Sequence, residues 1–261
     1  LTQDMFSIRD SLKNFKGKIV LTSHSPTIPS KEASIELNFI ERFLYGNIYK
    51  KLIIMDKFAF SKSDYLIFPC KESMEPYFKE WSEFKNIINN KKILYIPTGI
   101  REKKVLIDSD SIKNKYNIPK DAFVVSYVGR HNTIKGYDDL KKIGNKILTK
   151  YKNVYFLVAG LEKPLHGLNN KRWIEVGWTN DPYSIINASN IFVLPNKNTY
   201  FDLVLLEAMS LGKPILFSYT GGNKYFYKYN CGGLYKYEDI QDFYDQLSKL
   251  IVTSKEELTI E

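Results

Sequence analysis

An alternation of short apolar runs with segments of helical periodicity fills the second half of the chain. The run Phe123–Val128 is apolar at almost every position, as expected of a parallel strand that is covered on both faces. The next segment, Tyr137–Tyr151, places four apolar side chains on one face of a helix. Strands that alternate with helices in this way predict an open, mostly parallel sheet, and therefore an α/β fold class.

The same patterns extend along the whole chain. Further strands are predicted at 18–23, 65–69, 93–96, 154–159, 173–176, 191–194 and 214–217, and helices at 33–62, 71–81, 182–188, 203–211 and 239–251. The polar segment 101–110 is the predicted boundary between a domain 1–105 and a domain 106–261. Ser109 or Asp110 is expected to cap a short helix that follows this boundary.

Composition limits the partners and the location of the protein. The formal net charge of +9 is compatible with a solvated lysine surface, or with attraction to anionic lipid or a phosphate-bearing substrate. The lysines are scattered and no basic helix is apparent, so no nucleic acid partner is expected. Cys70 and Cys231 have no metal-ligand or disulfide pattern around them. Without a leader or an apolar span, we expect a cytoplasmic protein, and peripheral contact with the inner membrane face stays open.

Cationic side chains follow the first strand of the second domain. Ligands of open parallel sheets bind at the carboxyl ends of the strands. Arg130 leaves the strand after Gly129, and Lys135 stands just before the next helix. A guanidinium fork and an ammonium beside a helix N-terminus suit a diphosphate. The alternative is that both are solvated surface cations.

A carboxylate lies in an apolar helix later in the same domain. Glu207 stands in Leu203–Leu211, where a charge is costly unless it is paired or bonded to a ligand such as ribose hydroxyls. An exposed helix stripe is the alternative. Asp202 is expected to be the N-cap of this helix, and the paired glycines Gly221 and Gly222 to form a turn.

Together these motifs resemble glycosyltransferase family 4, the retaining transferases of GT-B architecture. The resemblance rests on Val128-Gly129-Arg130 with Lys135-Gly136, on the segment from Pro195 through Glu207 to Pro214, and on Thr220-Gly221-Gly222. Thr22-Ser23-His24 is similar to the family's histidine turn, more loosely. The resemblance implies two Rossmann-like parallel-sheet domains, of which the first is expected to be incomplete.

The family also implies roles for individual residues. Arg130 and Lys135 would bind the donor diphosphate beside Gly129, and Glu207 would hold the ribose. Trp178 would border the base, and His24 would face the reacting sugar. The remaining contacts to sugar and phosphates would come from the segment Thr199, Tyr200, Phe201, Asp202 and Leu203.

The implied reaction moves a sugar from a nucleotide-diphosphate donor, with UDP as the first choice, to a glycan, lipid-linked or protein acceptor. No cofactor and no metal are expected. Two positions depart from the family pattern: Thr199 and Asp202 stand where a glutamate and a glycine are usual. A non-catalytic binding or chaperone subunit of the same fold, and a sugar-nucleotide epimerase, therefore stay open as alternatives.

Overall fold

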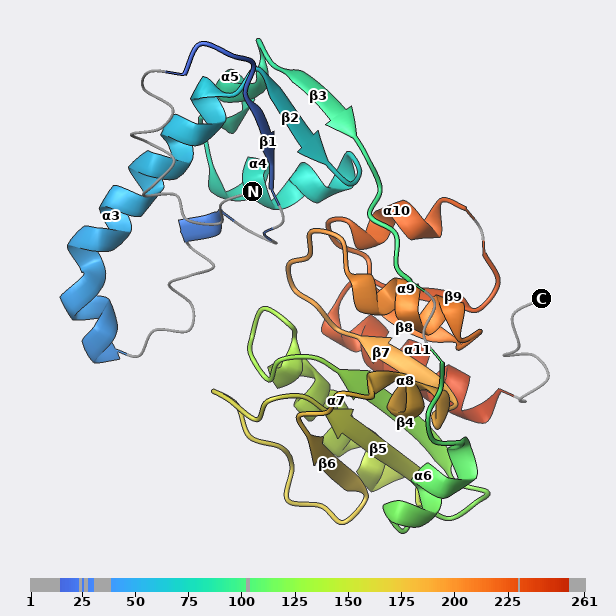
Figure 1. Cartoon of the computed structure of the whole chain (residues 1–261). Helices are drawn as coiled ribbons and strands as arrows, with labels where there is room; N and C mark the ends of the chain where they lie inside the picture. Colours follow the sequence, from blue (N-terminus) through green and yellow to red (C-terminus); the bar gives the residue numbers. More distant parts are fainter. Residues whose placement is uncertain are drawn as a thin grey trace. The chain divides into compact units, whose positions relative to one another are not determined.

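The computed structural model describes residues 15–23, 25, 28–30, 39–101, 104–229 and 231–253. Its contacts divide the chain into two units (Figure 1). Unit 1 comprises Leu1–Thr98 and Asn198–Phe201, and unit 2 comprises Gly99–Lys197 and Asp202–Glu261. His24 lies outside the described residues.

Unit 1 contains a three-stranded parallel sheet. The strands β1 (Val20–Thr22), β2 (Tyr65–Phe68) and β3 (Lys92–Tyr95) stand in that order. The long helix α3 (Phe39–Lys62) leads into β2, and η1 (Glu72–Met74), α4 (Glu75–Glu80) and α5 (Phe84–Ile88) connect β2 to β3. The core is aromatic, because the rings of Phe60, Phe68, Tyr77 and Phe84 pack on one another.

Unit 2 contains a six-stranded sheet in the order β6-β5-β4-β7-β8-β9, and every neighbouring pair is parallel. The strands are β4 (Phe123–Val128), β5 (Val154–Ala159), β6 (Trp173–Gly177), β7 (Ile191–Leu194), β8 (Ile215–Ser218) and β9 (Leu234–Tyr237). After β4 the chain continues to β5 and β6 toward one edge of the sheet, and after β7 it continues to β8 and β9 toward the other edge. The strand order therefore reverses between β4 and β7.

Helices cover both faces of this sheet. Helices α7 (Tyr137–Lys150) and α11 (Ile240–Val252) share a core with Val125 and Tyr127 of β4. Helices α6 (Ser109–Lys115) and α8 (Pro182–Asn187) share a second core with Val124. Successive residues of β4 thus point to opposite faces, which explains why its sequence is apolar throughout. The α/β parallel-sheet class expected from the sequence is confirmed.

Several local expectations differ from the structure. The cap of α6 is Asp108, whose side chain accepts a hydrogen bond from the Ser111 amide, whereas Ser109 and Asp110 are already helical. The sequence patterns did not predict α5, α10 (Asn223–Tyr227) or β9. Helices α5 and α10 are only five residues long, too short to establish a helical periodicity.

Candidate functional site

The loops that follow β4 and β7 lie at the place where a doubly wound sheet typically binds its ligand. These two strands are neighbours, and the chain departs from them toward opposite edges of the sheet. Ligands of such sheets bind at this reversal, outside the carboxyl ends of the strands. The loop after β4 carries Arg130 and Lys135, and the loop after β7 leads to α9 (Leu203–Ser210).

Gly129 extends the sheet pairing of β4 by one residue. Its amide donates to the carbonyl of Ala159 at 3.0 Å. A Cβ at this position would lie too close to the hydroxyl of Tyr127. That hydroxyl donates a hydrogen bond to the carbonyl of Arg130 at 2.9 Å. Close packing therefore disfavours a larger residue at this position, and Arg130, which follows it, is exposed.

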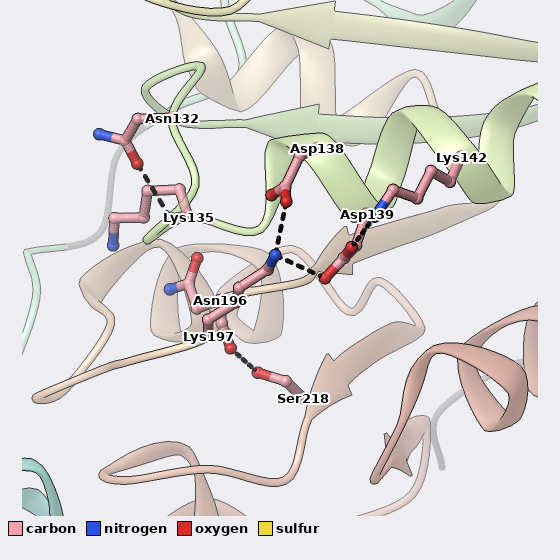
Figure 2. A network of polar contacts seen from close by, with 8 residues as sticks. All are labelled: Asn132, Lys135, Asp138, Asp139, Lys142, Asn196, Lys197 and Ser218. Carbon is pink, nitrogen blue, oxygen red and sulfur yellow. Dashed lines mark hydrogen bonds and ion pairs between the residues drawn. The ribbon is translucent and has the colours of Figure 1, made fainter.

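The turn before α7 is fixed by a glycine and an asparagine. The Lys135 amide donates to Asn132 Oδ1 at 2.9 Å (Figure 2). Gly136 has a φ of 64°, and a Cβ on it would fall onto the carbonyl of Pro195. The loop after β4, which carries Lys135, therefore packs directly against the exit of β7.

Lys135 forms an ion pair with Asp202. Its Nζ lies 2.8 Å from Asp202 Oδ1, and the Asn196 amide nitrogen donates to Asp202 Oδ2. The Asp202 side chain is 8% exposed and that of Lys135 is 23% exposed. Asp202 occupies the N-cap position of α9, but its side chain makes no capping hydrogen bond. The expected N-cap position of Asp202 is therefore confirmed, but its side chain does not cap the helix, because Lys135 and Asn196 bind it.

A second lysine bridges the first turn of α7. Lys197 Nζ lies 2.6 Å from Asp138 Oδ2 and 2.9 Å from Asp139 Oδ2 (Figure 2). Both carboxylates complement the positive end of the helix dipole. A cavity of about 240 Å³ lies next to Asp139 and Lys197, at the carboxyl ends of β7, β8 and β9.

Glu207 is half-buried on α9 and lies close to α8. Burial raises the pKa of Tyr183 in α8, and the Glu207 carboxylate raises it further. Leu205 and Ala208 are buried, whereas Leu203 is 44% exposed. One face of α9 is therefore in the core, and Glu207 stands at the border of that face.

Other expected site residues are spread over the structure. Trp178 follows β6, an edge strand, directly after Gly177, whose φ is 76°; its side chain is 69% exposed. Thr199, Tyr200 and Phe201 group with unit 1. Of the residues singled out from the sequence, the structure joins Lys135 directly to Asp202.

A buried polar cluster behind the β4–α7 loop was missed by the sequence analysis. The His131 ring is fully buried and burial lowers its pKa to about 4, so the imidazole is neutral at pH 7. Tyr137 Oη donates to Glu175 Oε1 at 2.5 Å, and Trp173 Nε1 donates to the same oxygen at 2.7 Å. Burial raises the pKa of Glu175. No motif marks these residues, so the sequence carries no signal for the cluster.

Two negative findings apply to the described part of the chain. There, no three or more histidine, cysteine, aspartate and glutamate side chains gather in a way that suits a metal ion. Among the helices in the same part, none has the length and apolar character needed to cross a membrane.

Comparison with known proteins gives consistent matches. A family model described as "Glycosyl transferases group 1" matches residues 122–253. The capsular polysaccharide biosynthesis glycosyltransferase CapM of Staphylococcus aureus is 30% identical over 128 residues, which are 45% of this chain and 34% of that protein. An uncharacterized glycosyltransferase of Methanocaldococcus jannaschii is 26% identical over 238 residues, 81% of this chain and 58% of that protein.

A third relative has a more specific name. The UDP-Gal:alpha-D-GlcNAc-diphosphoundecaprenol alpha-1,3-galactosyltransferase of Escherichia coli is 29% identical over 176 residues, 61% of this chain and 45% of that protein. The chain thus spans between 34% and 58% of the length of these three relatives.

Solved structures share the fold. WaaG, a glycosyltransferase involved in lipopolysaccharide biosynthesis, superposes with a TM-score of 0.67 at 15% identity and covers 96% of this chain and 73% of its own. Anabaena HepE, solved with UDP and glucose, gives a TM-score of 0.64 at 13% identity, over 93% of this chain and 64% of its own. These likenesses confirm the expected GT-B fold class.

Proposed function

The chain belongs to the group 1 glycosyl transferases, and from this premise we propose that it transfers a sugar from a UDP-sugar to a glycan or lipid-linked acceptor. Unit 2 would hold the donor. The observation that carries the proposal is the position of Arg130 and Lys135 on the loop after β4, at the reversal of the strand order.

The residues of unit 2 would offer partners to the diphosphate, the ribose and the base of the donor. The exposed Arg130 presents a guanidinium fork to the diphosphate, and Lys135 a point charge. Glu207 would accept hydrogen bonds from the ribose hydroxyls. Trp178 offers an exposed indole on which a base would stack.

The transfer reaction depends mainly on stabilisation of the negative charge that develops on the leaving diphosphate. The bond between the anomeric carbon and the diphosphate oxygen breaks, the acceptor oxygen bonds to that carbon on the same face, and the acceptor proton passes to the leaving phosphate. Arg130 and Lys135 would offset the negative charge that develops on the diphosphate, without a metal ion. The role of His24 toward the sugar stays an expectation from the family resemblance, because this residue lies outside the described part of the chain.

The relatives support the choice of substrate class. The name of the Escherichia coli relative gives UDP-Gal as donor and a diphosphoundecaprenol-linked sugar as acceptor. HepE was solved with UDP and glucose. The UDP donor and a lipid-linked acceptor are therefore the first combination to test.

Calorimetry on the 261-residue chain with UDP, GDP and ADP tests the donor site. We expect UDP to bind, and Arg130→Ala to weaken it. Lys120→Ala is the matched control, because Lys120 is 75% exposed and lies before β4, at the opposite end of that strand. Failure of all three nucleotides to bind the folded protein would contradict the proposal.

A non-catalytic binding subunit is the second candidate. The observation that favours it is the Asp202 carboxylate, which compensates the charge of Lys135. This candidate predicts a folded protein that binds none of the three nucleotides, so the same titration separates the two functions.

A further inference from the structure

A carboxylate lies within the predicted phosphate site. Asp202 Oδ1 is 2.8 Å from the Nζ of Lys135, the ammonium that would contact the donor diphosphate. A like charge beside a bound anion costs binding energy, and more so where water is scarce. The Asp202 side chain is 8% exposed, so water screens it poorly.

The carboxylate is held in place from two sides. Lys135 binds one oxygen, and the Asn196 amide nitrogen donates to the other. Asn196 itself is fully buried, and its backbone carbonyl accepts a hydrogen bond from Ser218 at 2.5 Å (Figure 2). A rigid neighbour therefore fixes the carboxylate, and rotation away from an incoming phosphate would break both contacts.

Lys135 can serve the carboxylate and a phosphate at the same time. A lysine ammonium carries three donors, and one N–H directed at Asp202 leaves others for a ligand. A bound diphosphate would then share Lys135 with Asp202 rather than replace it. Under this arrangement the affinity depends on how much negative charge the phosphate brings.

We infer that Asp202 is a specificity-determining residue that favours the sugar-bearing donor over the free nucleoside diphosphate left after transfer. The inference rests on the proposed function. In the donor the sugar esterifies the terminal phosphate, whereas the freed terminal phosphate has a second dissociation near pH 6 and carries about one more negative charge at pH 7. The fixed carboxylate repels the product more strongly, and so promotes its release.

The test compares UDP with UDP-galactose on the 261-residue chain, by calorimetry at pH 7.5 and low salt. Asp202→Asn keeps the shape and removes the charge. We expect this variant to bind UDP roughly tenfold more tightly and UDP-galactose roughly threefold more tightly. The preference for the donor over UDP should therefore fall about threefold. A purely structural role would change both affinities by the same factor.

Two further variants complete the experiment. Asp202→Ser also removes the charge and supplies a good N-cap residue, so it gives the same comparison if Asp202→Asn does not fold. Asp110→Asn removes an exposed carboxylate of unit 2 that lies 4.0 Å from Lys120, and should leave the preference unchanged.

The outcomes separate the two proposals. If the natural protein binds UDP or UDP-galactose and both Asp202 variants keep its preference, the inference is wrong and the proposed function stands. If the natural protein binds neither ligand, nor GDP or ADP, the proposed function fails and the inference with it.

Discussion

The imidazole of His131 lies flat on the phenol ring of Tyr137, with ring centroids 3.9 Å apart and planes inclined by 4°. Both rings are fully buried behind the loop that carries Lys135. Their stacking joins the end of β4 to the first turn of α7, so the loop with the predicted phosphate ligands rests on a neutral, buried histidine.

Replacement of His131 by phenylalanine should reduce the loss of stability in mild acid. The folded-state pKa of about 4 lies below the unfolded value of about 6.5. Between these values the unfolded chain binds more protons, so stability is full above about pH 6.5 and falls as the pH drops toward 4. Between pH 7 and pH 5 the loss attributable to this histidine is about 2 kcal/mol. Urea unfolding at pH 7 and pH 5 measures it.

Other groups titrate in the same window. The raised pKa of Glu175 acts in the opposite direction, since its folded form binds a proton more tightly than the unfolded chain does. The contribution of His131 is therefore the difference between the natural protein and His131→Phe. His166→Gln is the control, because the His166 side chain is 79% exposed. Equal pH dependence in all three proteins would show that His131 does not contribute.

Lys135→Ala should weaken UDP binding more than uridine binding. A charge-assisted hydrogen bond contributes about 1.5–3 kcal/mol, and uridine has no phosphate to receive it. Lys197→Ala removes the same charge from a lysine that pairs with Asp138 and Asp139 instead, and should cost much less UDP affinity. Calorimetry with both ligands gives the comparison. An equal loss for uridine and UDP would remove Lys135 from the phosphate site.

Glu207→Gln should weaken the binding of UDP by roughly 1–2 kcal/mol, because a neutral amide replaces a charged acceptor. The fold should survive, since Glu207 is only half-buried and the amide can still form hydrogen bonds. The 2′-deoxy analogue of UDP should bind the natural protein more weakly than UDP does, with a smaller difference in the variant. Equal affinity of the natural protein for both nucleotides would exclude the ribose contact.

Gly136→Ala should destabilise unit 2 more than Gly212→Ala. Both glycines have φ near +60°, which costs an alanine about 1–2 kcal/mol. A Cβ at Gly212 meets nothing within 4 Å, whereas one at Gly136 meets the Pro195 carbonyl. The difference in the free energy of unfolding, measured in urea, isolates that clash. Equal effects would mean that the loop adjusts without cost.

The sheet of unit 2 was largely predictable because its strands are buried on both faces. The predicted bounds of β4, β5 and β7 match the structure. In contrast, β9 reads Leu-Tyr-Lys-Tyr and lies at the edge of the sheet, where one lysine is tolerated and the apolar run is interrupted. A strand that is buried on both faces has a continuous apolar run that can be recognised in the sequence, whereas an edge strand has an interrupted one.

The polar pairs of the site were not predictable from the sequence. Lys135 and Asp202 are 67 residues apart, and their contact depends on the paths of two loops after different strands. The local sequence predicted that Asp202 caps α9. In the structure its carboxylate binds Lys135 and Asn196 and makes no capping hydrogen bond. The roles of Arg130, Glu207 and Trp178 toward a donor stay predictions until a nucleotide is bound.

The acidic first turn of α7 has a consequence for the ionic conditions under which the protein works. Asp138 and Asp139 already complement the helix dipole and bind Lys197, so the positive potential near the β4 loop comes mainly from side-chain charges such as the exposed Arg130. Dissolved ions screen such charges over about 8 Å at physiological salt. Nucleotide occupancy should therefore follow the ionic strength of the medium, so that the same donor concentration fills the site in dilute buffer and leaves it partly empty in concentrated salt.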